Sequence, residues 1–316
     1  MIAPLLVLTG ANGFVGHHFI KQYKHTGTRI RALTRSHQKT NTNLHDIEWV
    51  TGDLNDPHVW DKLLEPDCLF VNLAYSQETS LYESVKATQA MVNACANMKI
   101  GRLIQCSTIS VYGRTSGTPI DERTPCRPID DYGRLKLKLD QIILESSADR
   151  IDIAILRPSA IFGVGGQALN SLCNSLITRP HILNYVRSSL FGHRRMHLVP
   201  VETVVGALQF LCESNRTFDR EIFIVSEDDD PKNNFRDVEK ILMTALEIRD
   251  YPVPPFPMPS LLLRGLLLTK GRSEIDTSCY YSSSKLRELG FNSPVGFLTA
   301  LCAFAEQYKQ SYISRP

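Results

Sequence analysis

A glycine-rich segment near the N-terminus restricts the folds open to this chain more than any other feature. Its sequence is TGANGFVG (residues 9–16), directly after a short apolar run and directly before a helical pattern. Gly10 permits a tight turn, Gly13 lets the backbone approach a phosphate, and Gly16 lets the helix pack close to the strand. The N-terminus of such a helix favours a pyrophosphate. The sequence therefore predicts a dinucleotide site formed by Gly10, Asn12, Gly13, Phe14, Val15 and Gly16.

Short β-branched runs alternate with longer helical patterns along the chain. Strands are expected at residues 5–8, 29–34, 47–50, 68–73, 102–107, 151–156 and 221–225, and helices at residues 14–24, 57–64, 81–97, 131–146, 168–177, 235–246 and 298–308. This alternation implies βαβ units with right-handed crossovers. We therefore predict an α/β fold, a Rossmann-like doubly wound parallel sheet with a smaller C-terminal substrate lobe. The expected domains are a dinucleotide-binding domain at residues 1–157 and a mixed α/β substrate-binding lobe at residues 158–316, with segments crossing over.

Charge and cysteine usage exclude several classes of partner. The formal net charge is +2, so neither nucleic acid nor a charged membrane surface is expected as a partner. The eight cysteines are scattered without a C-x-x-C pair, which indicates reduced thiols and a cytoplasmic location. No secretory signal pattern is evident at the N-terminus. No metal is expected, because metal-ligand spacing is absent from His17, His18, His193 and His197.

Residues 251–268 form an unusual proline- and leucine-rich stretch. Five prolines at residues 251–259 predict extended backbone. The apolar run at residues 259–268 is interrupted by Arg264 and is too short to span a bilayer, so no integral membrane segment is expected. We interpret the run as a helix packed within the lobe; the alternative is a surface that contacts a membrane or a partner.

The end of the second expected strand indicates which nicotinamide cofactor is used. An acidic residue there would hold the ribose 2′-hydroxyl of NAD, whereas an arginine accepts the 2′-phosphate of NADP. This chain has Thr34 followed by Arg35. The sequence therefore favours NADP over NAD, although an arginine on a loop can also be a solvated surface cation.

A tyrosine and a lysine four residues apart form the candidate acid–base pair. Tyr132 and Lys136 occupy one face of an expected helix. An ordinary tyrosine has a pKa of about 10, and a neighbouring ammonium is expected to lower the pKa of Tyr132. The phenol could then exchange a proton with a substrate hydroxyl. The spacing alone is weak support, because exposed helices often carry such a pair.

Four motifs in chain order resemble the NAD-dependent epimerase/dehydratase family of extended short-chain dehydrogenases/reductases. They are the G-x-x-G-x-x-G loop, STISVYG at residues 107–113, YGRLK at residues 132–136 and RPSAIFG at residues 157–163. The resemblance is specific over residues 1–165 and weaker at residues 199–207 and 282–291. It implies an NAD(P)-dependent enzyme with the fold predicted above.

The resemblance also implies roles for individual residues. Thr108 would hydrogen-bond the substrate oxygen that Tyr132 protonates, and Lys136 would hold the nicotinamide ribose. Asp53 would contact the adenine amino group. Further cofactor contacts are expected from Leu54, Leu73, Ala74 and Pro158, and further substrate contacts from Ser107, Ser110 and Arg195.

The activity implied is keto-sugar reduction or C4 epimerisation of a nucleotide-linked sugar. Galactose-type epimerases often carry an asparagine in the segment that corresponds to residues 157–163, and its absence here favours reductases. One alternative is reduction of a hydrophobic ketone, as in dihydroflavonol reductases and hydroxysteroid dehydrogenases, for which residues 251–268 would suit an apolar pocket. Another is a non-catalytic NADP-sensing protein. Helices at residues 81–97 and 131–146 form the dimer interface in similar proteins, so a homodimer is expected.

Overall fold

The structure is a computed structural model that describes residues 5–23, 27–36, 47–75, 79–113, 115, 119–146, 151–192, 194–256 and 279–313. The chain divides into two compact units, each built from segments distant in sequence. The first comprises Met1–Gly113, Pro128–Arg157 and Val204–Phe223, and the second comprises Arg114–Arg127, Pro158–Thr203 and Ile224–Pro316. The segments at residues 114–127 and 204–223 therefore cross between the units.

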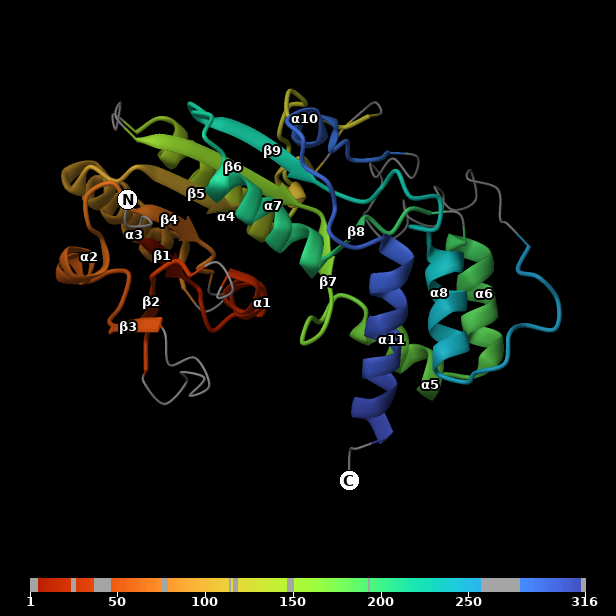
Figure 1. Cartoon of the computed structure of the whole chain (residues 1–316). Coiled ribbons are helices and arrows are strands. Elements are labelled where there is room, and N and C mark those ends of the chain that lie inside the picture. Colours follow the sequence, from red (N-terminus) through yellow and green to blue (C-terminus); the bar gives the residue numbers. More distant parts are fainter. Residues whose placement is uncertain are drawn as a thin grey trace. The chain divides into compact units, whose positions relative to one another are not determined.

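A seven-stranded sheet forms the centre of the first unit (Figure 1). Its order is β3-β2-β1-β4-β5-β6-β9, and the pairs from β3 to β6 are parallel. The strand bounds are β1 Leu6–Thr9, β2 Ile30–Thr34, β3 Ile47–Thr51, β4 Leu69–Asn72, β5 Arg102–Cys106, β6 Asp152–Pro158 and β9 Glu221–Val225. The Rossmann-like α/β fold is thus confirmed. The strand order reverses between β1 and β4, and such a switch point is where doubly wound sheets bind ligands.

Capping residues fix where the helices of the first unit begin. Asp56 accepts a hydrogen bond from the amide of His58 at the start of α2. Ser80 and Glu83 form a capping box on α3, and Asp130 accepts from the amide of Gly133 on α4. The helix bounds are α1 Phe14–Tyr23, α2 Pro57–Leu63, α3 Leu81–Met98, α4 Asp131–Leu144 and α7 Val201–Glu213.

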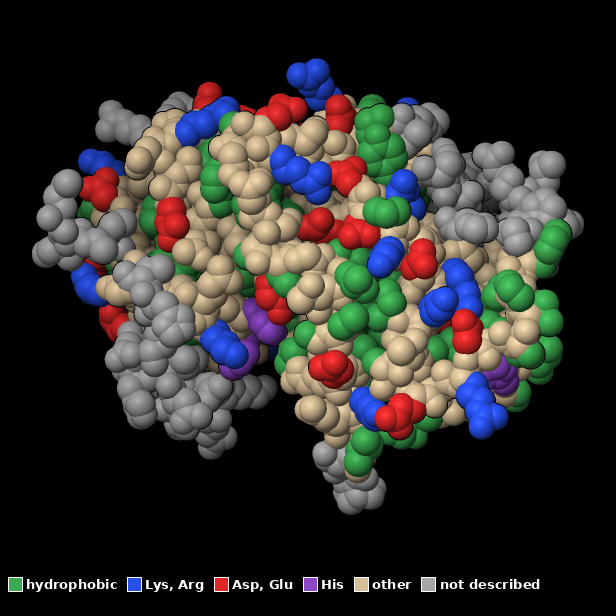
Figure 2. All heavy atoms as spheres, turned by 45° about the vertical axis from the view of Figure 1, so that its right-hand side comes forward, with side chains coloured by type: hydrophobic (Ala, Val, Ile, Leu, Met, Phe, Trp, Pro, Cys, Tyr) green, Lys and Arg blue, Asp and Glu red, His purple; other side chains and the backbone are tan. Residues whose placement is uncertain are grey.

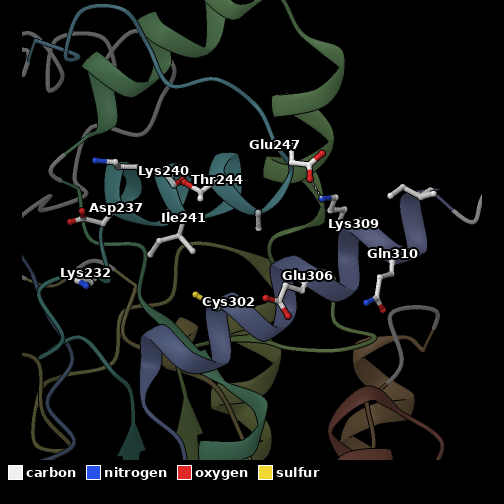
Figure 3. A pocket seen from close by; sticks show the side chains of 12 residues that line it. Lys232, Asp237, Lys240, Ile241, Thr244, Glu247, Cys302, Glu306, Lys309 and Gln310 are labelled. Carbon is white, nitrogen blue, oxygen red and sulfur yellow. Dashed lines mark hydrogen bonds and ion pairs between the residues drawn. The ribbon is translucent and has the colours of Figure 1, made fainter.

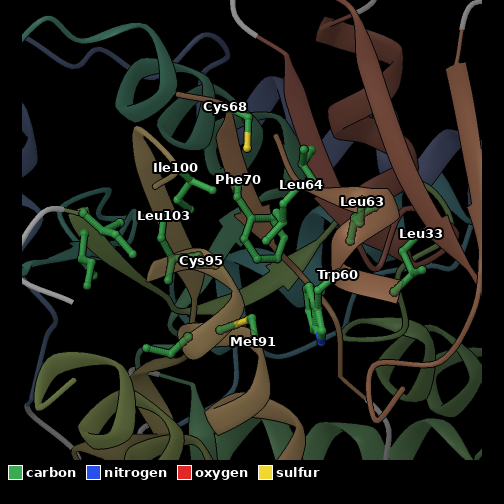
Figure 4. Packing of buried hydrophobic residues seen from close by; sticks show 14 of the residues in the cluster. Leu33, Trp60, Leu63, Leu64, Cys68, Phe70, Met91, Cys95, Ile100 and Leu103 are labelled. Atoms are coloured by element: carbon green, nitrogen blue, oxygen red, sulfur yellow. The ribbon is translucent and has the colours of Figure 1, made fainter. Parts of the chain in front are cut away.

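A buried apolar cluster packs α2 and α3 against the sheet, around Trp60 and Phe70 (Figure 4). The two rings meet edge to face with centroids 6.0 Å apart. Met91 and Cys95 of α3 close the cluster from the helix side. The parallel pairing of β1 with β4 places Thr9 beside Asn72 at the carboxyl ends of the two strands.

A buried arginine ties the ends of β5, β6 and α7 together. Arg102 pairs with Asp152 through an Nε–Oδ2 distance of 2.6 Å. Its other nitrogens donate to the carbonyl oxygens of Leu211, Ser214 and Arg216 at 2.6 to 2.8 Å. Every nitrogen of the guanidinium plane is thereby used, which makes this buried ion pair structural.

The second unit combines a two-stranded parallel sheet with helices. It contains β7 Ala160–Phe162, β8 Leu198–Pro200, α5 Asn170–Thr178, α6 His181–Phe191, α8 Phe235–Ala245, α10 Ser284–Glu288 and α11 Phe297–Ile313. Phe162 lies at its core, in edge-to-face contact with Phe297 and Phe304. The helix expected at residues 259–268 lies outside the described part of the chain, as does His193.

Helix α6, absent from the sequence prediction, packs Tyr185 and Phe191 against the core but also has polar residues on its buried side. It buries Asn184 and Ser188, while Ile182, Leu183 and Val186 are 64%, 55% and 50% exposed. Figure 2 shows hydrophobic side chains exposed on the surface of the molecule. An apolar stripe normally marks the buried face of a helix, and here apolar side chains lie on the exposed face as well.

A histidine–aspartate pair in the second unit predicts pH-dependent stability. His197 Nδ1 lies 2.6 Å from Oδ2 of the fully buried Asp228. Burial alone would lower the pKa of His197, but hydrogen bonds with Asp228 and Cys279 outweigh burial and raise it to about 9. The pair is therefore fully stabilising below the unfolded pKa of about 6.5 and loses its effect as the pH rises through 9.

We expect His197→Gln to lower the melting temperature most at about pH 6.5 and least above about pH 10. The measurement is thermal unfolding followed by circular dichroism across this range. His181→Gln is the control, because its imidazole hydrogen-bonds only a backbone carbonyl, that of Arg249, among the hydrogen bonds described. A difference between wild type and His197→Gln that stays constant with pH would contradict the pairing.

Candidate active site

The glycine-rich segment that joins β1 to α1 leaves no room for a side chain at Gly10 or Gly16. Gly10 has a φ of 71°, and a Cβ there would lie 2.6 Å from the carbonyl carbon of Leu73. A Cβ on Gly16 would lie 2.2 Å from the carbonyl oxygen of Gly10, to which the amide of Gly13 donates at 2.9 Å. Phe14 and Val15 open α1, where the first backbone N–H groups lack helical acceptors. The result is a backbone cradle that fits a pyrophosphate.

A cavity of about 400 Å³ extends from this loop over the carboxyl ends of β2, β3 and β4. Its volume is in the range of small-molecule sites. Eight residues that the sequence assigned to the cofactor line it: Gly10, Asn12, Gly13, Arg35, Asp53, Leu54, Leu73 and Ala74. These residues fit a dinucleotide, because the cradle lies at the switch point and the cavity continues from it past β2.

Polar contacts organise the rim of the cavity at β2. Asn12 Nδ2 donates to Thr34 Oγ1 at 3.1 Å, and Thr34 Oγ1 donates to the carbonyl of Ser36 at 2.9 Å. Arg35 is exposed beside them. Asp53 accepts from the backbone amide of Asn55 at 2.8 Å, which shapes the turn after β3.

The candidate acid–base residues meet where β5 ends and α4 begins. Lys136 is buried and its Nζ donates to the carbonyl oxygen of Cys106 at 3.1 Å. Tyr132 is half-buried and its phenol hydrogen-bonds the side chain of Thr108. Thr108 Oγ1 also accepts from the amide of Ser110 at 3.2 Å and so caps a short 3-10 turn. The structure thus brings the three predicted residues together.

Tyr75 joins this group, although the sequence analysis did not single it out. Its ring centroid lies 5.0 Å from that of Tyr132, at an interplanar angle of 70°. Lys136 Nζ lies 5.3 Å from the Tyr75 centroid, and Tyr75 also lines the cavity. The position of Tyr75 could have indicated a role in the site, because it lies three residues beyond the end of β4 at the switch point of the sheet.

The pKa of Tyr132 differs from the sequence expectation. Burial raises it to about 12, Cys106 and Tyr75 add to the rise, and the hydrogen bond from Thr108 opposes it. Burial also lowers the pKa of Lys136, against the opposing effects of Cys106 and Asp140. The expected net lowering of the Tyr132 pKa by Lys136 was therefore wrong for the protein alone, because desolvation of the phenolate dominates.

The remaining predicted residues have protein partners. Ser107 Oγ donates to Asp140 Oδ2 at 2.9 Å, and Ser110 Oγ accepts from Thr108 Oγ1 at 3.3 Å. Arg195, in the second unit, donates to the carbonyl oxygen of Asp228 and stacks on Tyr280. Pro158 is the last residue of β6.

A larger hollow of about 800 Å³ lies between α8 and α11 of the second unit (Figure 3). Lysines and carboxylates alternate along it, and Lys309 pairs with Glu247 at 2.6 Å. None of the predicted site residues lines it. The two helices lack a convergent acid–base group there, so the chemistry is assigned to the first unit.

The sheet order, the glycine cradle and the Tyr132–Lys136 pair together define a Rossmann-like dinucleotide-binding enzyme. The sequence profile of the NAD dependent epimerase/dehydratase family matches residues 6–224. The chain belongs to this family, as its motifs predicted. Among the described residues, no helix is long and apolar enough to cross a membrane.

Two relatives show how much of the chain is similar to proteins of known name. The 2-alkyl-3-oxoalkanoate reductase of Stenotrophomonas maltophilia is 29% identical over 175 residues, covering 52% of this chain and 53% of that protein. The UDP-glucose 4-epimerase of Azospirillum brasilense is 23% identical over 207 residues, covering 61% and 58%. The chain thus spans about half the length of the curated relatives it matches.

A solved structure shows the same fold across the chain. MoeE5 in complex with UDP-glucose and NAD has a TM-score of 0.69 and 20% identity, covering 98% of this chain and 100% of that one.

Proposed function

We propose that this chain is an NAD(P)-dependent enzyme that acts on a nucleotide-linked sugar, by keto-sugar reduction or C4 epimerisation. The observation that carries the proposal is the convergence of Thr108, Tyr132 and Lys136. Tyr132 and Lys136 both pack against Tyr75, which lines the cavity that begins at the glycine cradle. The names of an epimerase relative and of a UDP-glucose complex support a sugar nucleotide as the substrate.

Tyr132 can act as the proton donor when a substrate carbonyl is reduced. With a pKa of about 12 the phenol carries its proton at neutral pH, so Tyr132 can donate it to a substrate carbonyl oxygen. The hydroxyl of Thr108 would orient that oxygen. Lys136 would hold the ribose of the cofactor through its ammonium. The nicotinamide, when bound, supplies the hydride chemistry.

The test is a substrate panel with NADPH and NADH. UDP- and dTDP-linked keto-sugars are compared with alkyl and steroid ketones by following reduced-cofactor absorbance. The proposal expects turnover of a nucleotide-linked sugar and a thermal shift with UDP or dTDP sugars. Turnover of apolar ketones alone would instead establish the second candidate, a hydrophobic-ketone reductase, which the 2-alkyl-3-oxoalkanoate reductase relative favours. Dinucleotide binding with no turnover of any ketone would favour a sensing role.

We further propose that NADP is the preferred cofactor. Arg35 is exposed at the cavity rim directly after β2, and residues 34–36 contain no acidic side chain. A guanidinium there suits the 2′-phosphate, and an acid would repel it.

Arg35→Asp should weaken NADP binding by about 10- to 100-fold, since hydrogen bonds to charged groups contribute about 1.5–3 kcal/mol. NAD affinity should change little or rise. Isothermal titration calorimetry with both dinucleotides measures the ratio. Arg29→Asp is the matched control, a largely exposed arginine of the first unit that does not line the cavity. An unchanged NADP/NAD ratio in Arg35→Asp would refute the preference.

The cellular location and the oligomeric state of the enzyme are proposed from other features of the chain. All eight cysteines are free, which suits a reducing compartment such as the cytoplasm. We propose a homodimer formed through α3 and α4. Light scattering on the purified protein tests the oligomeric state.

A further inference from the structure

A buried carboxylate lies below the candidate acid–base pair on the same helix. Tyr132, Lys136 and Asp140 follow one another at four-residue intervals and share one face of α4. Asp140 is fully buried, and its Oδ2 accepts from Ser107 Oγ at 2.9 Å. Arg157 of β6 donates to the same oxygen through Nε at 3.2 Å and a terminal nitrogen at 3.1 Å. Three donors therefore hold one oxygen of this carboxylate.

The other oxygen has no such partner. Asp140 Oδ1 is buried and accepts no hydrogen bond among the described residues. Leaving a buried carboxylate oxygen unpaired is costly, so its retention calls for a functional explanation. The Arg157 guanidinium is itself fixed, because it donates to the hydroxyl of Tyr112 at 3.1 Å and lies 5.1 Å from that ring's centroid. The network thus holds a negative charge at a set depth beneath Lys136.

At both Lys136 and Asp140, neighbouring charges shift the pKa in the direction opposite to that of burial. Burial lowers the pKa of Lys136, while the charge of Asp140 raises it. Burial holds the pKa of Asp140 above its usual value, and Arg157, the Ser107 hydrogen bond and Lys136 oppose that rise. Three donors on Oδ2, one of them a permanently charged guanidinium, favour the ionised carboxylate. The titratable groups packed around the pair are Cys106 of β5, Arg157 of β6, Tyr75 after β4, Tyr112 after the 3-10 turn and Tyr132 of α4.

We infer that Asp140 is a positioning residue whose carboxylate, held by Ser107 and Arg157, keeps the buried Lys136 protonated in the active site. The inference rests on the proposed function for its consequence, because under that proposal a charged Lys136 holds the ribose of the cofactor. Without the carboxylate, burial drives the amine towards its neutral form. The network therefore acts on catalysis through Lys136 and touches neither substrate nor cofactor.

The test follows the protonation of Lys136 directly, without substrate. Protein labelled with ¹³Cε-lysine is titrated by NMR, with the Lys136 signal assigned by its loss in Lys136→Arg. In Asp140→Asn the midpoint should fall by about one pH unit or more, a tenfold change in the protonation equilibrium. Asp140→Glu, which keeps the charge, should restore most of the wild-type midpoint. NADP affinity of Asp140→Asn should fall over the same pH range.

Asp152→Asn is the matched control. It breaks another buried ion pair of the same unit, between Asp152 and Arg102, and should lower the melting temperature without moving the Lys136 midpoint. A folded Asp140→Asn that titrates like wild type overturns the inference, whatever its turnover. If Asp140→Asn does not fold, the ¹³Cγ signal of Asp140 in wild type decides. An ionised Asp140 throughout the Lys136 titration supports the inference, and a neutral Asp140 at neutral pH overturns it.

Failure of the proposed function gives a different pattern. In that case the Lys136 midpoint still responds to Asp140, while no nucleotide-linked sugar is turned over by wild type.

Discussion

Tyr132→Phe should abolish turnover of the substrate and leave dinucleotide binding close to wild type. Phenylalanine keeps the ring contact with Tyr75 but removes the proton that Tyr132 would donate to the substrate oxygen. General acid catalysis is worth about 10²- to 10⁴-fold in rate, so kcat should fall by about that factor. The half-buried ring keeps its place, so the melting temperature should change little. Steady-state kinetics and calorimetric titration of NADP on one preparation give both values.

Tyr82→Phe is the matched control for the loss of a phenol hydroxyl. Tyr82 lies on α3, is 76% exposed and does not line the cavity. It should retain wild-type kcat. Activity of Tyr132→Phe within about twofold of Tyr82→Phe would be incompatible with a general-acid contribution of the usual size.

The second large effect is expected at the glycine cradle. Gly10→Ala forces a side chain into a left-handed backbone conformation and 2.6 Å from the Leu73 carbonyl carbon. The combined strain and overlap should cost about 2–4 kcal/mol of folding free energy. Displacing the loop from β4 should also weaken NADP binding by about 100-fold or more, since each 1.4 kcal/mol is tenfold. Denaturant unfolding and calorimetric titration measure the two effects.

Gly27→Ala separates backbone strain from overlap. Gly27 has nearly the same φ, 72°, but no atom lies within 4 Å of the position that a Cβ would take there. Gly27→Ala should lose only about 1–2 kcal/mol of folding free energy and bind NADP normally. Equal losses of NADP affinity in the two variants would show that the cradle at Gly10 does not hold the cofactor.

Local signals explain why the first unit could be predicted from the sequence. The Pro57 start of α2, the Asp130 cap of α4 and the β-branched strand runs each act within a few residues. Helix α6 of the second unit depends on a contact with the helix that precedes it. Helix α6 turns Asn184 and Ser188 inward, and Asn184 finds its acceptor in the carbonyl of Ser175 on α5. No periodicity in the α6 segment reports such a partner.

The residues of the candidate site differ in the same way: some are carried by local motifs and others depend on tertiary contacts. Gly10, Tyr132 and Lys136 could be found because short motifs carry them. The Asp140–Arg157 pair could not, since its role arises from a tertiary contact between α4 and β6. The pKa of Tyr132 was misjudged for a related reason, because the sequence shows the neighbouring lysine and hides the burial.

The most direct test of the proposed function follows hydride into the sugar. Wild type and Tyr132→Phe are incubated with NADPH deuterated at the transferable position and a UDP- or dTDP-linked keto-sugar, and the product is analysed by NMR and mass spectrometry. The proposed function predicts deuterium on a ring carbon of the sugar with wild type and at most a trace with Tyr132→Phe. With unlabelled UDP-glucose and oxidised cofactor, inversion at C4 would identify epimerisation instead. An enzyme that binds NADP yet leaves every nucleotide-linked sugar unlabelled and uninverted would contradict it.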